Sequence, residues 1–266
     1  MSTNEQTLLA EVLALAHRAG DAILAVYAQR FEVTTKDDRS PLTLADLRSH
    51  EIIEERLRTL TPDIPVLSEE SSAIPFEERR NWRRFWLVDP LDGTKEFVSR
   101  NGEFTVNIAL IEGHAPTLGV VHVPVQGVTY SGLRGQGAYR HEDRKAERLQ
   151  ARVPAATPLR IVGSRSHRGD SLDRVLPKLE PYELVAVGSS LKFCLVAEGS
   201  ADFYPRFGPT SEWDTAAAQA VVEAAGGAVV KLDGTPLDYN TKPDLLNPHF
   251  LVYGDRSRDW VRTIAG

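Results

Sequence analysis

Cysteine is almost absent from this chain of 266 residues, which contains Cys194 alone. With a single thiol no intrachain disulfide can form, and a reducing compartment fits this composition. The chain also lacks any apolar run near the roughly 20 residues that a membrane-spanning helix needs. Lys and Arg together number 31 against 37 for Asp and Glu, which gives a net charge of −6. This mild acidity argues against a general nucleic-acid binder, because such proteins normally carry a basic excess.

The first thirty residues contain no basic segment followed by an apolar one, so we expect no secretory signal and a cytoplasmic protein. Hydrophobic residues make up 42% of the chain and charged residues 26%, which is ordinary for a globular protein. A chain of this length buries enough apolar surface to fold without a disulfide or a structural metal. Internal repeats and low-complexity tracts are absent.

Two helices are predicted before any strand. Apolar residues recur at helical spacing from Val12 to Val26, and a second helix opens at Thr43, after an interruption that ends at Pro41. Short strands punctuated by Gly, Pro and Asn follow, and they predict an antiparallel sheet. These strands are residues 85–88, 105–111, 119–125 and 127–133.

From about residue 155 strand-like and helix-like segments alternate, which predicts an α/β arrangement. The polar segment 142–158 contains two prolines and marks the boundary. We therefore expect an α/β protein with an α+β N-terminal half, residues 1–150, and an α/β C-terminal half, residues 151–266.

The most informative motif lies at the end of the first strong strand. The apolar run 86–88 leads into Asp89, Pro90 lacks the N–H that a strand would use, and Asp92 follows three residues after Asp89. Two carboxylates at the end of a strand suit a hard cation such as Mg²⁺. The N–H groups after Asp92 could bind an anion, and Gly93 lets the chain turn closely there. Asp–Pro and Asp–Gly pairs also mark ordinary turns, so a plain turn is an equal alternative.

Other acids lie near predicted element ends. Glu69 and Glu70 follow a short apolar run, and Asp214 precedes an alanine-rich helix. Asp46 and Asp214 each follow a Thr or Ser by three residues, which is the spacing of a helix cap, so capping is the alternative for both. Taken together with Asp89 and Asp92, these acids instead indicate a shared metal site.

Residues 66–70, 86–97 and 213–227 resemble the three signatures of the inositol monophosphatase superfamily, whose members are Mg²⁺-dependent, lithium-sensitive phosphatases. Within it the resemblance is closest to the CysQ-type 3′(2′),5′-bisphosphate nucleotidases, through residues 101–111, 188–199 and 204–209. It extends from about Leu8 to about Val252. It implies a layered α-β-α-β-α sugar-phosphatase fold with the metal site where the two halves meet.

The resemblance also implies roles for single residues. Glu69, Asp89 and the backbone carbonyl of Leu91 would hold one Mg²⁺, and Asp89, Asp92 and Asp214 a second. Asp46 and Thr94 would form a hydrogen-bonded pair near the attacking water, and Asp46 or Glu69 would help a third, weaker metal. Asp46, Thr94 and Glu69 are thus the catalytic candidates, and Glu70 is expected to be exposed or behind the ligands.

The same resemblance supplies a substrate site. Its candidates are Glu69, Leu91, Asp92, Gly93, Thr94, His167, Gly188, Lys192, Arg206 and Asp214. His167 would contact sugar or phosphate, Gly188 would allow close approach, and Lys192 and Arg206 would bind the phosphate that is not cleaved. The structural alternatives are a non-functional His167, a solvated Lys192 and an Arg206 held in a salt bridge.

The implied reaction is hydrolysis of the 3′-phosphate of adenosine 3′,5′-bisphosphate to AMP, in sulfur metabolism, with its phosphosulfate analogue as a further candidate substrate and Li⁺ as an inhibitor. The alternatives are an inositol monophosphatase, a fructose-1,6-bisphosphatase of the same superfamily, or a non-catalytic nucleotide-sensing module. Peripheral association with the inner face of the cell membrane is an alternative to a free cytoplasmic protein. The sequence assigns no oligomeric state.

Two further patterns have structural interpretations. Residues 79–86 interleave arginines with aromatic side chains, but adjacent glutamates and the acidic chain favour a solvated loop over a nucleic-acid patch. Gly132, Gly135 and Gly137 lack a following helix with Lys-Ser or Lys-Thr, so hairpin turns are the expected role.

Overall fold

Two long helices form the first layer of the structure. The protein is described by a computed structural model over residues 2–29, 41–164 and 170–265. Helix α1 (Ser2–Tyr27) turns a stripe of apolar residues inward, as their spacing predicted. The stripe is fully buried and consists of Val12, Leu15, Ala16, Ala19, Ile23 and Val26. Helix α2 (Pro41–Leu60) begins two residues earlier than predicted, because a proline is tolerated in the first turn of a helix.

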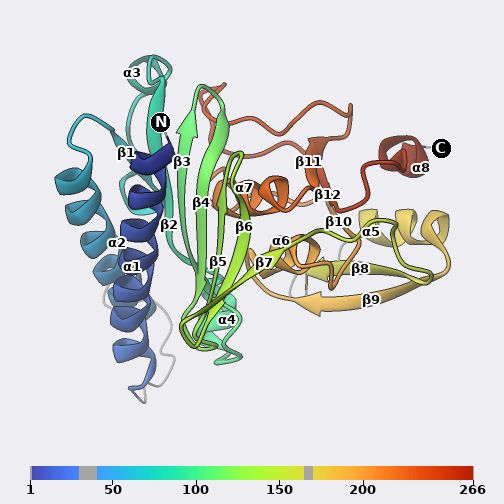
Figure 1. Ribbon diagram of the computed structural model, residues 1–266, viewed down its shortest axis with the longest axis horizontal. Coiled ribbons are helices and arrows are strands. Elements are labelled where there is room, and N and C mark those ends of the chain that lie inside the picture. The colour runs from blue at the N-terminus through green and yellow to red at the C-terminus, as the bar shows by residue number, and fades with distance from the viewer. Residues whose placement is uncertain (1, 30–40, 165–169, 266) are drawn as a thin grey trace.

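These helices cover one face of a seven-stranded sheet with the strand order β1-β2-β3-β4-β5-β6-β7 (Figure 1). Its strands are β1 (Val66–Ser68), β2 (Arg84–Asp92), β3 (Thr105–Glu112), β4 (Ala115–Val123), β5 (Val128–Leu133), β6 (Gly137–Glu142) and β7 (Lys145–Leu149). The predicted antiparallel pairing holds from β2 to β7, whereas β1 pairs with β2 in parallel. Strands β6 and β7 were not predicted; β7 exposes four of its five residues, so it carries no apolar alternation.

The second sheet has five strands in the order β11-β12-β10-β8-β9. They are β8 (Leu159–Ser164), β9 (Tyr182–Val187), β10 (Phe203–Arg206), β11 (Ala228–Lys231) and β12 (Phe250–Tyr253). Strand β8 runs parallel to β9 and β10, while β12 runs antiparallel to β10 and β11. The C-terminal half is therefore α/β as predicted, with a mixed rather than purely parallel sheet.

Helices α6 (Leu191–Ala197) and α7 (Ala216–Ala224) lie between the two sheets and share a core with both (Figure 1). Helix α5 (Asp170–Val175), the 3₁₀ turn η2 (Leu176–Leu179) and helix α8 (Trp260–Ala265) pack on the outer face of the second sheet. The result is the α-β-α-β-α layer order that was predicted. Because α7 follows residue 151 yet packs on β3, β4 and β5, the division of the chain into two halves stays a prediction.

The segment 79–86 differs from the solvated loop that was predicted. It begins with the end of helix α3 (Phe76–Arg79), and Arg79 is 1% exposed. The Arg79 guanidinium donates to Asn240 Oδ1 at 2.5 Å and to the backbone carbonyls of Lys242 and Pro243. Arg80 alone of this pair is exposed, with a surface ion pair to Glu77. The arginines therefore divide between burial and solvent, and the buried one binds distant backbone.

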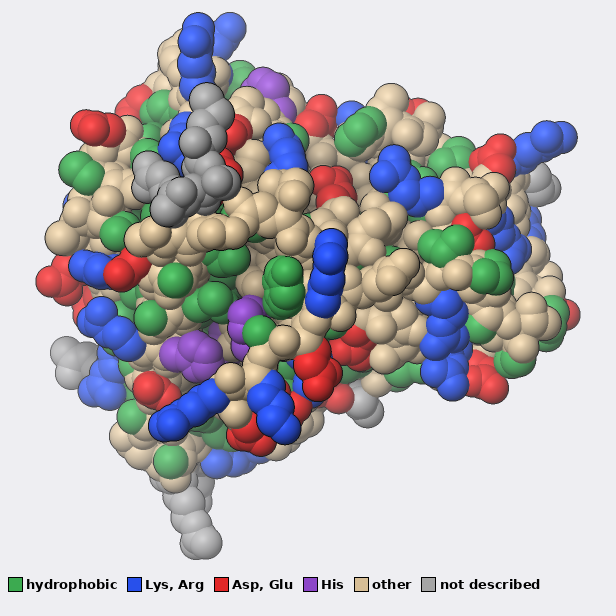
Figure 2. Space-filling view, viewed as in Figure 1, with side chains coloured by type: hydrophobic (Ala, Val, Ile, Leu, Met, Phe, Trp, Pro, Cys, Tyr) green, Lys and Arg blue, Asp and Glu red, His purple; other side chains and the backbone are tan. Residues whose placement is uncertain are grey.

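Charged side chains of both signs are interspersed over the face of the molecule seen in Figure 2. Within the described part of the chain, no helix combines the length and apolar character needed to cross a membrane.

Candidate active site

The end of strand β2 brings two aspartates to one face of the sheet. Asp89 lies opposite Asn107 on β3, and Asp92 lies opposite Thr105, so β2 has one more residue than β3 over this interval. Residues three apart on a regular strand point to opposite faces, and the extra residue of a β-bulge corrects this. Pro90 fits the bulge because it has no N–H to leave unpaired. The carbonyl of Pro90 accepts from Ser49 Oγ at 2.8 Å, which fixes the bulge to helix α2.

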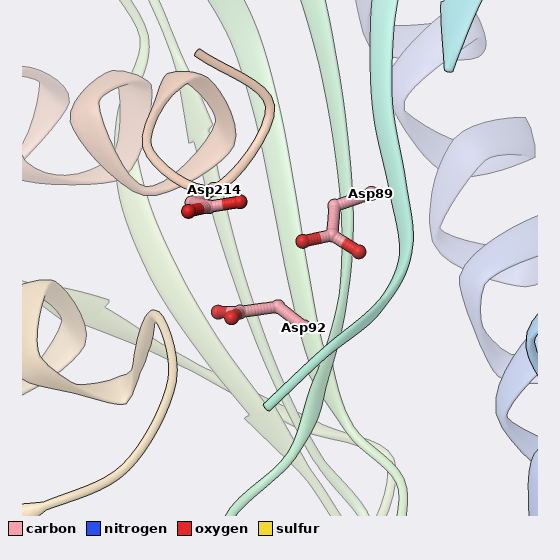
Figure 3. Close-up of side chains that lie close together, drawn as sticks. All are labelled: Asp89, Asp92 and Asp214. Carbon is pink, nitrogen blue, oxygen red and sulfur yellow. The ribbon is translucent and has the colours of Figure 1, made fainter. Parts of the chain in front are cut away.

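A third aspartate reaches the same point from the turn before α7. Carboxylate oxygens of Asp89, Asp92 and Asp214 lie within 4.8 Å of one another, and Figure 3 shows the three side chains converging. Asp214 Oδ2 accepts from the backbone N–H of Ser211 at 2.9 Å. The Ser-x-x-Asp spacing allowed this contact as part of a helix cap, but α7 begins at Ala216 after Thr215, so the contact closes the turn before the helix and does not cap it. Asp214 therefore supports this turn and also belongs to the carboxylate cluster.

The electrostatics of this cluster favour a bound cation. Burial raises the pKa of Asp89 well above its usual range, and repulsion from Asp92 and Glu69 raises it further. Burial, followed by repulsion from Asp92, raises the pKa of Asp214 to about 8. Carboxylates held this close are costly to ionise unless a cation compensates them. An all-oxygen donor set of this kind fits a hard divalent cation.

Glu69 lies beside the three aspartates. It is the first residue of the 3₁₀ turn η1 (Glu69–Ser71), directly after β1, whose Ser68 pairs with Val88 on β2. The parallel register therefore carries Glu69 to the level of Asp89. Burial raises the pKa of Glu69, as does repulsion from Glu70 and Asp92, while a hydrogen bond with Asp89 opposes the rise. Glu70 is exposed, as expected.

Asp46 is buried on helix α2 with its Oδ1 atom lacking a hydrogen-bond partner among the described residues. Burial raises the pKa of Asp46 to about 8, with further contributions from Glu70 and Glu69. The capping alternative for Asp46 is wrong, because α2 begins at Pro41 and Thr43 lies inside it. The expected hydrogen bond to Thr94 is not formed within the described part of the chain, since Asp46 faces the two glutamates.

A cavity of about 300 Å³ opens next to the carboxylates. Its lining includes Asp92, Gly93, Thr94, Glu96, Ser189, Ser190, Lys192, Tyr204, Arg206, Thr210 and Asp214. Gly93 has φ of +95° and leads into the short helix α4 (Thr94–Val98), and this left-handed conformation strongly favours glycine. The chain can therefore turn directly from Asp92 into the cavity wall that Thr94 begins.

Lys192 and Arg206 bring positive charge to the cavity. Lys192 is 7% exposed, so the solvated-helix alternative is wrong, and its Nζ donates to the Ser189 carbonyl at 2.5 Å. Burial lowers the pKa of Lys192 to about 8, although Asp92 opposes the shift. Arg206 donates from Nε to Thr210 Oγ1 at 2.7 Å and from Nη2 to the Pro209 carbonyl at 2.8 Å. Arg206 thus holds the loop 207–210, and it forms no salt bridge with any residue that the structure describes.

Gly188 and His167 are the two remaining substrate candidates. The close approach that Gly188 permits is to the protein itself, because an added Cβ would lie 2.5 Å from Glu96 Cγ. The Gly188 N–H donates to Glu103 Oε2 at 2.8 Å. His167 lies outside the described residues.

Sequence reasoning gave no role to Ser190, whose backbone N–H donates to Asp92 Oδ2 at 2.6 Å. Nor did it give one to Asn107, which is buried on β3 opposite Asp89 and whose Nδ2 lies 3.5 Å from Asp92 Oδ2. The signal for Ser190 was its place in the segment 188–199, but its partners are 24 to 98 residues away in the sequence and only the fold reveals them.

Comparison with known proteins gives concordant matches over nearly the whole chain. The sequence model of the inositol monophosphatase family matches residues 4–254. The 3′(2′),5′-bisphosphate nucleotidase CysQ of Escherichia coli O157:H7 is 53% identical over 247 residues, which cover 92% of this chain and 99% of that protein. The protein of the same name from Haemophilus influenzae is 40% identical and covers 98% of this chain and 97% of its own length.

Solved structures agree with the layer order. CysQ from Bacteroides thetaiotaomicron superposes with a TM-score of 0.85 at 43% identity, covering 94% of this chain and 98% of that one. An inositol monophosphatase from Zymomonas mobilis gives a TM-score of 0.81 at 22% identity and covers 98% of each chain. At that lower identity the likeness concerns the fold alone, and it confirms the predicted fold class.

Proposed function

Because the chain belongs to the inositol monophosphatase family, we propose that it is a 3′(2′),5′-bisphosphate nucleotidase that hydrolyses the 3′-phosphate of adenosine 3′,5′-bisphosphate to AMP and phosphate. Relatives 40% to 53% identical over nearly the whole chain have that name. The observation that carries the proposal is that Asp92 and Asp214 line the same cavity as Lys192 and Arg206. The acidic part suits cations around the cleaved phosphate, and the basic part suits a second phosphate.

Two or three Mg²⁺ ions are the proposed cofactors. Asp89, Asp92 and Asp214 would hold one ion, and Glu69, Asp89 and the Leu91 carbonyl another. The fit rests on the oxygen-only donors and on the raised pKa values of these carboxyls. When bound, such ions lower the pKa of water and stabilise negative charge on phosphate oxygens.

The catalytic side chains proposed are Asp46, Thr94 and Glu69. The Oδ1 atom of Asp46 has no protein partner among the described residues, so it can accept a hydrogen bond from a water molecule. Glu69, which bonds to Asp89, would orient that water toward phosphorus. Thr94 lines the cavity and would bind the cleaved phosphate together with the backbone after Gly93.

The uncleaved phosphate is assigned to Lys192 and Arg206. Lys192 is desolvated, so its charge acts through a medium that screens it less than water does. Arg206 offers a planar donor group next to the loop 207–210, which it orders. Sugar contacts by His167 and substrate contact by Gly188 stay predictions.

A role in sulfur metabolism, hydrolysis of the phosphosulfate analogue and inhibition by Li⁺ belong to the same proposal. A cytoplasmic location stays a prediction. No feature of the described residues supports the alternative of peripheral association with a membrane.

The test is phosphate release from adenosine 3′,5′-bisphosphate, beside inositol 1-phosphate and fructose 1,6-bisphosphate, with Mg²⁺ and then with excess chelator. We expect chelator-sensitive release that is at least tenfold faster from the nucleotide. Faster release from either of the other esters would move the substrate assignment to that ester. Absence of release from all three would leave a non-catalytic nucleotide-binding module, which equilibrium dialysis with the nucleotide would detect.

A substitution of Lys192 tests whether this residue binds the uncleaved phosphate rather than the cleaved one. Lys192→Met should raise KM for the bisphosphate roughly 10- to 100-fold, since a hydrogen bond to a charged group contributes about 1.5–3 kcal/mol. Hydrolysis of a monophosphate ester should change far less. Lys231→Met, which removes a surface pair with Asp238, is the matched control. Equal effects of Lys192→Met on both substrates would contradict the assignment.

A further inference from the structure

Ser190 occupies the residue before helix α6, where a serine usually caps its own helix. Here the side chain makes no capping hydrogen bond to α6. Its hydroxyl instead lies between Asp92 and Asp214, and Ser190 is 2% exposed. The Ser190 side chain therefore forms its hydrogen bonds with residues outside α6.

The contacts of Ser190 converge on two aspartates from different elements. Its backbone N–H and its Oγ approach Asp92 Oδ2 at 2.6 Å and 2.9 Å, and Oγ also lies 2.6 Å from the Asp214 carbonyl. Asn107 Nδ2 donates to Ser190 Oγ at 2.9 Å. A hydroxyl has one proton, so Ser190 shares it between Asp92 and Asp214 while Asn107 occupies a lone pair.

These bonds fix which atoms face the cluster. With Oδ2 of Asp92 held by Ser190, the other carboxylate oxygen is left for a cation. Holding the Asp214 carbonyl from one side, while Ser211 N–H holds its carboxylate from another, orients that residue as well. Partners that orient ligands in this way commonly change metal affinity by about 10- to 100-fold when they are removed.

The same turn also holds the cationic part of the cavity. Ser189 has φ of +44°, an unusual conformation for a residue other than glycine, and its carbonyl accepts from Lys192 Nζ. One two-residue turn thus binds a metal-centre carboxylate through Ser190 and Lys192 through Ser189. Hydroxyl burial alone does not account for this arrangement, because Asn107 would satisfy an isolated serine.

We propose that Ser190 is a positioning residue, which orients Asp92 and Asp214 for the cation and sets the metal centre at a fixed distance from Lys192. The inference rests on the proposed function for its substrate, but its first consequence concerns cation binding alone. Ser190 itself touches neither the cation nor the phosphate in this assignment.

The experiment measures Mn²⁺ dissociation constants by electron paramagnetic resonance, and kcat and KM for adenosine 3′,5′-bisphosphate. Ser190→Ala should weaken Mn²⁺ binding by about 10- to 100-fold and shift the Mg²⁺ concentration for half-maximal activity equally. Saturating Mg²⁺ should restore most of kcat, while KM stays raised. Ser131→Ala, which removes another buried hydroxyl that bonds to His141 away from the site, should leave Mn²⁺ binding unchanged.

Two more variants keep the inference open to refutation if Ser190→Ala fails to fold. Ser190→Thr retains the hydroxyl and should bind Mn²⁺ within a few-fold of the wild type, whereas Asn107→Ala should weaken binding. Mn²⁺ affinity in Ser190→Ala or Asn107→Ala equal to the wild type would overturn the proposal. If the wild type binds Mn²⁺ but leaves the nucleotide intact, the proposed function fails while the role of Ser190 is still decided by the Mn²⁺ constants.

Discussion

Carboxyl groups concentrated at one point make the metal-free protein sensitive to pH. The pKa of Asp46 and that of Asp214 are both raised to about 8 in the folded chain, whereas an unfolded aspartate ionises near 3.8. Between these values the folded state holds more protons than the unfolded state. The free energy of unfolding therefore falls as pH rises from about 4 to about 8.

In chelator we expect a fall of about 2 kcal/mol or more between pH 5 and pH 8, measured by urea unfolding. With Mg²⁺ the fall should be reduced or reversed, because the cation binds the ionised carboxylates. A free energy of unfolding that is independent of pH in chelator would show that these carboxyls ionise normally.

Asp89→Asn removes one ionisable carboxyl from the group of carboxyls that repel one another when ionised. We expect the melting temperature in chelator to rise by about 2–4 °C, which corresponds to about 1 kcal/mol in a protein of this size. Mg²⁺ should raise the melting temperature of the wild type but not that of Asp89→Asn, because the ion has lost a ligand. Most of the phosphatase activity should be lost for the same reason. Asp63→Asn, at an exposed position, should change none of the three. Retained activity in Asp89→Asn would refute the metal assignment.

Helix α7 sits unusually close to the first sheet, and a strand glycine makes room for it. Gly132 was expected in a hairpin turn, but it lies within β5, where an added Cβ would be 2.5 Å from the Ala220 carbonyl oxygen. Only Gly135, with φ of +77°, is in the turn between β5 and β6 as expected. Since Asp214 lies just before α7, the packing of α7 also places a carboxylate.

Gly132→Ala should therefore lower the free energy of unfolding by about 1–3 kcal/mol through overpacking. It should also weaken Mn²⁺ binding, since displacement of α7 moves Asp214. Gly163→Ala on β8, where the nearest atom to a new Cβ is Leu184 Cδ1 at 3.4 Å, is the control and should change stability little. If Gly132→Ala is destabilised but binds Mn²⁺ with unchanged affinity, the close packing of α7 does not determine the position of Asp214.

Elements with a local signal were predictable, and elements without one were not. The apolar stripe of α1 follows from helical periodicity, and the strand that leads into Asp89 follows from its apolar run, although β2 continues through Pro90 to Asp92. By contrast, β7 exposes most of its residues, and β10 is only four residues long, so neither stands out from its neighbours. The register shift at Asp89 and Asp92 was equally hidden, because a bulge is defined by the partner strand.

At the scale of the whole molecule, a buried arginine joins distant parts of the chain. Arg79 bonds to Asn240 and to the carbonyls of Lys242 and Pro243, more than 160 residues later in the sequence. The backbone N–H of Asn240 in turn donates to Glu212 Oε2 at 2.8 Å, two residues before Asp214. Such long-range partners explain why the burial of Arg79 could not be predicted from its cationic and aromatic neighbours.

Arg79→Ala should lower the free energy of unfolding by about 3 kcal/mol, because it leaves several buried acceptors unpaired. The neighbouring Arg80→Ala removes only a surface ion pair and should cost less than about 1 kcal/mol. Chemical denaturation of both variants, with a test for coincident transitions, gives the comparison. Equal losses of the free energy of unfolding in the two variants would show that the buried hydrogen bonds of Arg79 stabilise the protein no more than a surface ion pair does.

Cys194 lies on α6 with 0% exposure, in the layer that both sheets cover. Since it is the chain's single thiol, a thiol reagent can modify the protein only when this middle layer opens to solvent. The rate of Cys194 labelling therefore reports how often the core opens, and its measurement needs no engineered cysteine. A slower rate of Cys194 modification in the presence of Mg²⁺ would show how much the bound cation suppresses opening of this middle layer.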